Sequence, residues 1–312
     1  MAQIVLTAGI DVSKEWLDTG LWPKKLELRV RRNREGYTEL GSWLRQHGVT
    51  RVGLEASGGY EIEVIDALED MGFEVVRLNA QRVRMFANAK GRLAKNDRVD
   101  ALTIAQATVI LVEQLPGKRR RDLDPLIEHL AYRRQLSDWK TDCANQLEHL
   151  TDKALRDKAM ARKAAFAMEI AQLDKAIAAL INGHSEWRAL ARRLRSVPGV
   201  GPVLTATLIA FLPELGRLPR RAIAALVGLA PYDQDSGHHS GERHIKGGRD
   251  TVRNVLYMAA VSAKRHNPII AAFAERLAGK KPKVIIVACM RKLLVILNAM
   301  LRDGNDWQTK AA

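Results

Sequence analysis

Cysteine and aromatic residues are scarce in this sequence. Only Cys143 and Cys289 occur among 312 residues, and Phe, Trp and Tyr together make up 5%. Two isolated cysteines, with no CxxC motif and no Cys/His cluster, support neither a disulfide framework nor a zinc site. We therefore expect both thiols to be small core residues.

Long apolar runs and nucleotide-binding motifs are also missing. No apolar run approaches the roughly 20 residues that a membrane-spanning helix needs. Acidic Asp11 interrupts the apolar start "MAQIVLTAGIDVSK" where a signal peptide would continue its core. No GxxxxGK[ST] motif is present, so nothing indicates a P-loop ATPase. The sequence predicts a cytoplasmic protein that does not contact membranes.

Acidic residues are outnumbered by basic ones. The chain has 50 Lys and Arg against 35 Asp and Glu, which gives a net charge of +15 and an isoelectric point near 10.0. An excess of this kind indicates which partners a protein binds and not how it folds. The charge alone makes nucleic acid the first candidate partner and an anionic membrane the second, and of these two we predict nucleic acid. With 47% hydrophobic residues, the chain can form two or three domains with ordinary cores.

Strand and helix patterns alternate over residues 1–112. The predicted strands are residues 4–12, 26–32, 51–56 and 73–79, and the predicted helices are residues 36–48, 59–72 and 97–111. Strands separated by helices of this length imply an α/β layered domain.

Two long helical patterns fill residues 113–185. After the basic segment "PGKRRR", apolar residues recur with helical spacing from Leu123 to Leu150, and a second such face runs from about Arg162 to Ile181. This pattern predicts a helical hairpin or coiled coil. It either packs within the chain or forms a dimerisation arm.

Residues 186–312 are predicted to form a mainly α domain. The segment "SVPGVGPVLTATLIAFL" has the pattern of a helix-hairpin-helix, whose glycines let backbone N–H groups approach a DNA phosphate, although a structural turn has the same pattern. Residues 251–266 and 283–304 are apolar nearly all round, so we expect them in the core. Residues 228–249 form a long polar loop, a feature that is usually functional or disordered.

Four acidic residues stand where a metal site could form. Asp11 ends the first predicted strand and Glu55 ends the third, and ligand sites collect at strand ends in α/β sheets. Asp97 and Asp100 are three residues apart at a predicted helix start, so they share one face. Each alone fits a helix cap or a solvated strand end. Packed together, carboxylates need a neutralising cation, and hard oxygen ligands select Mg²⁺ or Mn²⁺.

Six segments resemble the transposases of the insertion-sequence-110 family. They are "GIDVSK", "LEASGGY", "LNAQRVRMFANAKGRLAKNDRVDALTIA", "SVPGVGPVLTATLIAFL", "RDTVRNVLYMAAVSAKRHNPII" and "KVIIVACMRKLLVILNAM". The resemblance implies a RuvC-like (RNase H-like) N-terminal domain with Asp11, Glu55, Asp97 and Asp100 as its acidic set. It also implies a coiled-coil middle and a C-terminal transposase domain.

The same resemblance implies a catalytic serine and an RNA partner. The family's acidic-Ser-Gly motif is matched by Ser236 in the segment "DSG". Family members act as homo-oligomers and use a structured bridge RNA that pairs with donor and target DNA, so we expect a dimer or a dimer of dimers.

The loop around Ser236 has the composition that such chemistry requires. A serine hydroxyl must be activated by a base, a metal or a cationic environment. Arg243, Lys246 and Arg249 follow closely and would bind the scissile phosphate. Ser240 has the same access but lacks the family context, so Ser236 is preferred. Further predicted nucleic-acid contacts are Lys118, Arg119, Arg120 and Arg121.

These features predict a site-specific recombinase of an insertion sequence. Ser236 would attack a DNA phosphate positioned by the metal, leaving a covalent phosphoserine link that is later reversed onto another strand. Two other interpretations fit the composition. One is a hydrolytic RuvC-like nuclease or junction resolvase, in which water attacks. The other is a non-catalytic nucleic-acid-binding protein whose acidic residues cap helices.

Overall fold

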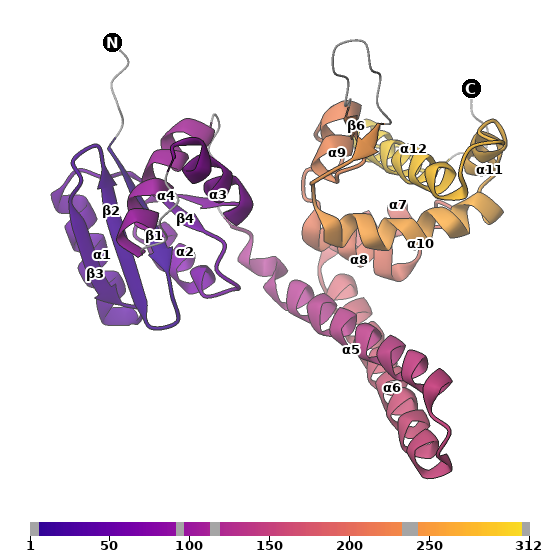
Figure 1. The fold of residues 1–312 in the computed structure, drawn as a ribbon. Helices are drawn as coiled ribbons and strands as arrows, with labels where there is room; N and C mark the ends of the chain where they lie inside the picture. Colours follow the sequence, from indigo (N-terminus) through magenta and orange to yellow (C-terminus); the bar gives the residue numbers. More distant parts are fainter. Residues whose placement is uncertain (1–5, 92–96, 113–118, 233–242, 308–312) are drawn as a thin grey trace. The chain divides into compact units, whose positions relative to one another are not determined.

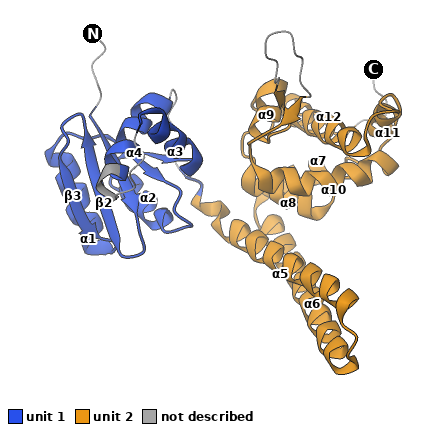
Figure 2. Ribbon diagram, viewed as in Figure 1, with its two compact units in different colours: residues 1–120 blue, residues 121–312 orange. Residues whose placement is uncertain are grey.

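The computed structural model describes residues 6–91, 97–112, 119–232 and 243–307. The chain divides into two units, residues 1–120 and 121–312 (Figures 1 and 2). The helical hairpin that the sequence predicts as a middle domain groups with the C-terminal unit.

A five-stranded mixed sheet forms the centre of the first unit, in the order β3-β2-β1-β4-β5. The strands are β1 Thr7–Val12, β2 Trp16–Trp22, β3 Glu27–Arg31, β4 Arg51–Glu55 and β5 Glu74–Leu78. β2 pairs antiparallel with β1 and β3, whereas β1, β4 and β5 run parallel. This arrangement is consistent with the predicted RNase H-like α/β domain.

Helices cover both faces of this sheet (Figure 1). They are α1 Arg34–Gln46, α2 Glu61–Asp70, α3 Ala80–Ala89 and α4 Asp97–Leu111. Ile10 and Leu54 are fully buried in a core with Leu40 of α1 and Leu68 of α2. α4 packs on the opposite face, where Ile104 is buried among apolar residues of β5 and α3.

The sequence patterns do not predict β2 or α3. Leu17, Thr19 and Leu21 are buried at alternate positions of β2, so the strand period is present. The alternation of apolar and exposed polar residues that marks a strand is nevertheless hard to see in the sequence. Asp18 and Gly20, on the other face of the strand, are also covered by neighbouring elements.

Three glycines let α4 lie against the sheet. Gly9 pairs with Gly20 on β2 and with Gly53 on β4, so the three form one row across the strands. A Cβ on Gly9 would lie 2.1 Å from the carbonyl oxygen of Ala101, and one on Gly53 would lie 1.7 Å from Thr108 Oγ1. α4 therefore rests directly on the strand backbones.

The described part of the second unit is mainly helical. A 3-10 turn, Arg121–Leu123, leads into α5 Asp124–His149, α6 Lys153–Gly183, α7 Ser185–Arg195, α8 Pro202–Phe211, α9 Arg220–Leu226, α10 Asp250–His266, α11 Pro268–Glu275 and α12 Pro282–Asp303. Two short strands, β6 Pro231–Tyr232 and β7 His244–Ile245, pair antiparallel. The two predicted long helices are α5 and α6. α6 begins earlier than predicted because Asp152 caps it, accepting a hydrogen bond from Leu155 N at 2.9 Å.

α12 is the one helix in the described part of the chain that is long and apolar enough to cross a membrane. A core helix passes the same test. Cys289, Leu293 and Leu297 are fully buried in the core of the second unit, together with Leu256 of α10. Each of the two helices thus has one face in the core, whereas Met258 of α10 and Val284 of α12 are 65% and 48% exposed. Cys143 of α5 is only half-buried.

We expect Gly9→Ala to destabilise the first unit. Its Cβ would overlap the α4 backbone, and overpacking typically costs about 1–3 kcal/mol. Gly183→Ala is the matched control, because a Cβ there meets nothing within 4 Å and alanine is favoured in helices by about 1 kcal/mol. Urea unfolding followed by circular dichroism measures both. An unchanged midpoint for Gly9→Ala would contradict the close helix–sheet contact.

Candidate active site

Asp11 and Glu55 lie at the carboxyl ends of two neighbouring parallel strands. Ile10 pairs with Leu54, so Asp11 and Glu55 occupy the next position on each strand. Both are half-buried. Each follows by two residues a glycine that faces α4, which puts both side chains on the α4 face of the sheet. The structure thus brings two of the four predicted carboxylates to one edge.

The other two predicted carboxylates lie in the first turn of α4. Asp97 opens the helix, and its side chain lies outside the described residues. Asp100 is half-buried and directly precedes Ala101, whose carbonyl oxygen lies against Gly9 of β1. Among the residues that the structure describes, no three His, Cys, Asp or Glu side chains are close enough to hold a metal ion. The complete quartet stays a prediction.

A further carboxylate, Asp18, shares this face of the sheet. Asp18 pairs with Asp11 across the β1–β2 ladder and is only 7% exposed. Its Oδ1 lies 3.6 Å from Nε of Arg29 on β3. Arg29 therefore offsets part of the negative charge beside Asp11. The sequence patterns missed Asp18 because they missed its strand.

Glu61 holds the loop that follows Glu55. Its side chain is fully buried, and Oε2 accepts hydrogen bonds from Ser57 N at 3.0 Å and Gly59 N at 2.8 Å. Arg77 donates to Oε1. Burial raises the pKa of Glu61, but backbone hydrogen bonds and the charge of Arg77 outweigh it, so the pKa lies below its usual value. Glu61 is charged at neutral pH and keeps the loop in place.

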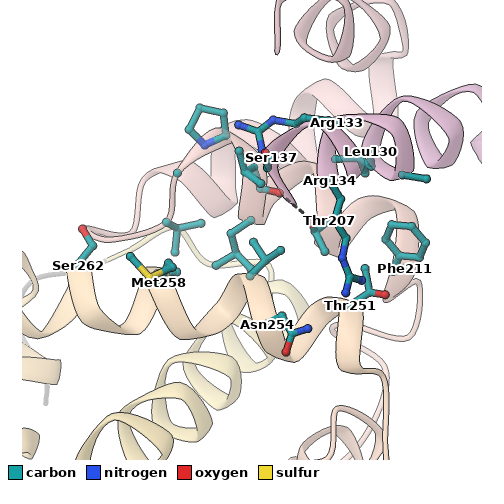
Figure 3. Close-up of a pocket in the computed structure, with 18 of the residues that line it drawn as sticks. Leu130, Arg133, Arg134, Ser137, Thr207, Phe211, Thr251, Asn254, Met258 and Ser262 are labelled. Atoms are coloured by element: carbon teal, nitrogen blue, oxygen red, sulfur yellow. Dashed lines mark hydrogen bonds between the residues drawn. The ribbon is translucent and has the colours of Figure 1, made fainter. Parts of the chain in front are cut away.

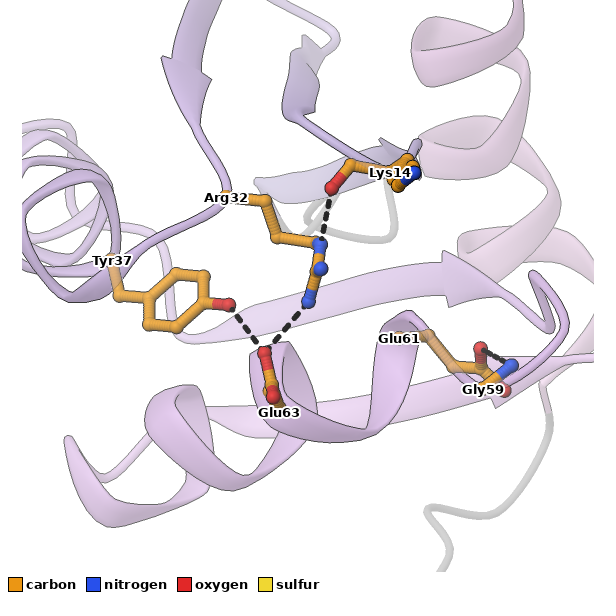
Figure 4. A network of polar contacts seen from close by, with 6 residues as sticks. All are labelled: Lys14, Arg32, Tyr37, Gly59, Glu61 and Glu63. Atoms are coloured by element: carbon orange, nitrogen blue, oxygen red, sulfur yellow. Dashed lines mark hydrogen bonds and ion pairs between the residues drawn. The ribbon is translucent and has the colours of Figure 1, made fainter.

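Arg32 connects the turn after β1 to α2 (Figure 4). Its Nε donates to the Lys14 carbonyl oxygen at 2.9 Å, and its Nη1 donates to Glu63 Oε2 at 2.7 Å. The Tyr37 hydroxyl donates to the same Glu63 oxygen at 3.2 Å. Burial and the charge of Glu63 raise the pKa of Tyr37, so it stays a donor. Sequence patterns could not identify Arg32 or Glu61, because the contacts of Arg32 and the ion pair between Glu61 and Arg77 join different elements.

The serine loop is carried by the hairpin of β6 and β7. Ser236 and Ser240 themselves lie outside the described residues. At the base of the hairpin, Gly228 and Gly248 have φ angles of 73° and 74°, and a Cβ on Gly248 would lie 2.2 Å from Gly228 N. The crossing of the two chain segments therefore requires glycine at both positions.

The turn between α7 and α8, predicted as a helix-hairpin-helix, is seated on α10. Gly199 has a φ of 94°, and a Cβ there would lie 2.6 Å from Ala263 Cα. Asn267 Nδ2 donates to the Pro198 carbonyl oxygen at 3.3 Å. Close packing against α10 thus explains why glycine stands at position 199. The predicted contact of this turn with a DNA phosphate stays a prediction.

Arg249 and Arg119, which are predicted to bind DNA, form ion pairs with carboxylates of the protein itself. Arg249 binds both carboxylate oxygens of Glu214 at 2.6 Å each. Arg119 binds Asp66 through Nε at 3.0 Å and through Nη2 at 2.6 Å. Exposed side chains are found at Arg120, Arg121, Arg243 and Lys246. Lys118 lies outside the described residues.

We expect Glu61→Gln to lower the free energy of unfolding at neutral pH by about 1–3 kcal/mol, because charged hydrogen bonds to a buried group are lost. A pKa that is lower in the folded chain gives stability above the unfolded value of about 4.3, and this stability is lost as the pH falls through the folded value. The difference between wild type and variant should therefore shrink in acid. Urea unfolding at several pH values measures it, with exposed Glu35→Gln as control. A difference that persists unchanged in acid would contradict this assignment.

Two family models match the chain. Residues 8–155 match a transposase model named for the DEDD motif and IS110, and residues 191–275 match a model described as the transposase IS116/IS110/IS902 family. The first match contains all four predicted carboxylates, and the second contains the serine loop.

Related proteins extend over nearly the whole chain. The pilin gene-inverting proteins of Moraxella lacunata and Moraxella bovis are 25% and 26% identical over 333 residues, covering 97% of this chain and 97% of each relative. The insertion element IS110 43.6 kDa protein of Streptomyces coelicolor is 29% identical over 140 residues, covering 44% of this chain and 35% of that protein. With both transposase models matched in order along the sequence, the chain belongs to the IS110 family of transposases.

Proposed function

We propose that this transposase is a site-specific DNA recombinase of an insertion sequence, which cuts and rejoins DNA with a serine nucleophile and a metal-binding acidic quartet. One observation carries the proposal. The strand register sets Asp11 beside Glu55 at the edge of the sheet, on the face covered by α4, within a transposase chain.

Asp11, Glu55, Asp97 and Asp100 are the residues that would hold divalent cations. Their oxygens are the hard ligands that Mg²⁺ and Mn²⁺ prefer, and neighbouring half-buried carboxylates favour a cation between them. When bound, such a cation would polarise a DNA phosphate and stabilise its developing charge. The chain's own contribution is to hold the carboxylates in register and to keep the loop after β4 in place through Glu61.

Ser236 is the proposed nucleophile. Its Oγ gives up its proton and bonds to phosphorus, the bond from phosphorus to the departing sugar oxygen breaks, and that oxygen takes up a proton. The resulting phosphoserine ester conserves the bond energy, so a DNA hydroxyl can attack it and release the serine without ATP. The β6–β7 hairpin supports the loop, and the Arg249–Glu214 ion pair anchors its base.

Rejoining distinguishes this function from that of a hydrolytic nuclease. The Moraxella relatives are named as inverting a pilin gene. Inversion of a DNA segment requires that strands be rejoined after they are cut, and we carry this requirement over to the present chain. A non-catalytic DNA-binding protein would do neither step.

We propose donor DNA, target DNA and a structured bridge RNA as partners, acting on a homo-oligomer. The RNA rests on the family resemblance. The oligomer is supported by the α5–α6 hairpin, where apolar side chains are between 42% and 64% exposed at Trp139, Leu155, Met160 and Met168. Packing against a second hairpin would remove this apolar surface from water.

Asp11→Asn and Glu55→Gln should each reduce DNA cleavage by at least about 100-fold, because each removes charge that stabilises the transition state. Glu74→Gln is the control. Glu74 is the first residue of β5, at the end of the parallel strands opposite to Asp11 and Glu55, and its side chain is 49% exposed. Cleavage of labelled DNA that carries the element ends, with added Mg²⁺, measures the effect. Wild-type cleavage in EDTA would rule out the metal.

Ser236→Ala should abolish cutting and joining together, whereas Ser240→Ala should retain most of both. The alanine removes the attacking oxygen. The readout is a covalent protein–DNA adduct on denaturing gels, with its attachment site mapped by mass spectrometry. If Ser236→Ala cleaves at the wild-type rate and leaves free DNA ends, then water attacks and the hydrolytic nuclease is the better assignment.

A further inference from the structure

A large cavity opens in the second unit between α5, α8 and α10 (Figure 3). Its volume is about 1030 Å³, at the upper end of the roughly 300–1,000 Å³ range of pockets that hold drug-sized molecules. Apolar side chains dominate its wall, among them Val203, Phe211 and Val255. The cavity therefore suits largely apolar groups.

One face of α10 forms a wall of this cavity. Thr251, Val255, Met258 and Ser262 recur every three or four residues along the helix and all line the cavity, together with Asn254. Met258 is 65% exposed, whereas Leu256 and Ala260 of the same helix are fully buried. An adaptable methionine beside hydroxyl and amide groups fits partners that have both apolar faces and polar edges, as nucleobases do.

Basic side chains stand at the cavity on α5. Arg134 is exposed, and Figure 3 shows it reaching from α5 toward Thr251 and Phe211. Arg133 also lines the cavity, but its guanidinium binds Asp174 at 2.6 Å. Arg134 is thus placed to meet a phosphate or to stack on a base.

The basic surface continues onto α7. A smaller cavity of about 70 Å³ shares Arg133, Pro202 and Val203 with the large one and is also lined by Arg195. Exposed Arg188, Arg192 and Arg195 are four and three residues apart on α7, so they form one stripe. A strand of nucleic acid with its bases in the large cavity would find guanidinium groups along its backbone.

We propose that this cavity binds an unpaired stretch of the DNA on which the transposase acts. The bases lie against Met258, Val255 and Phe211, and the phosphates lie against Arg134 and the α7 stripe. A duplex does not fit, because its bases are stacked inside it. The inference rests on the proposed function only in taking DNA as the substrate.

The test is binding of a fluorescent oligothymidylate of about 12 nucleotides to the full chain, by anisotropy. Met258→Glu should weaken binding about tenfold or more, because the carboxylate repels phosphate and displaces the bases. Met85→Glu is the matched control. It introduces the same charge at a methionine that is 67% exposed on α3 of the first unit, outside the cavity, and should leave the Kd unchanged.

Salt dependence provides an independent readout. Arg134→Gln should reduce the slope of log Kd against log salt by about 0.7, the value for one phosphate contact on a single strand. Circular dichroism melts that match wild type confirm that both variants fold. Equal oligothymidylate binding by wild type and Met258→Glu would overturn the proposal.

Two other outcomes would also overturn it. One is loss of oligouridylate binding alone, which would make the occupant RNA. The other is a change in oligomeric mass of Met258→Glu by light scattering with DNA binding intact, which would make the face a protein interface. The assay involves no cleavage, so its outcome does not depend on the proposed nucleophile. If the cavity variants bind DNA like wild type, the proposed recombinase chemistry is unaffected. If Ser236 proves not to be the nucleophile, the proposed DNA-binding cavity is unaffected.

Discussion

The contact between α4 and the strand backbones is the constraint on which the first unit depends. It exists because Gly9, Gly20 and Gly53 present no side chains to the helix. Asp11 and Glu55 stand two residues further on, and Asp100 stands in the helix itself. Any side chain in the glycine row would move the helix and Asp100 by a distance comparable to a bond length, which would change the spacing of the carboxylates in the proposed metal site.

Negative charge at this edge of the sheet is balanced locally. Asp18 stands opposite Asp11, and carboxylates this close repel each other unless cations offset them. Arg29 supplies one such cation on β3. Arg32 and Glu61 act differently, since they hold the turn after β1 and the loop after β4 through hydrogen bonds with the backbone.

The second unit combines a rigid core with surfaces suited to nucleic acid. α10 is central to both. Its inner face packs against α12, while its outer face lines the cavity beneath Arg134. The same helix seats Gly199 of the α7–α8 turn and begins at the anchored base of the serine hairpin. DNA held along this face would therefore be connected through one helix to the loop that carries the proposed nucleophile.

Many of the secondary-structure elements and site candidates could be predicted from local sequence patterns. Alternating strand and helix periods identify the α/β unit, continuous helical periods identify α5 and α6, and strand ends place Asp11 and Glu55 as site candidates, because these features depend on neighbours within one or two turns of chain. The charge excess likewise pointed to nucleic acid without any fold. The family motifs singled out Ser236, which composition alone did not separate from Ser240.

Other features required the tertiary structure. The register of β1 with β4, the position of Asp18 opposite Asp11, and the clamp of Glu61 by Arg77 join segments that no local window contains. The cavity likewise arises where three separate helices meet. Sequence alone determined which side chains were available and, outside β2 and α3, on which element most of them would lie. Only the folded chain decided which of them meet, because strand register and helix–sheet approach are set by the packing of the whole unit.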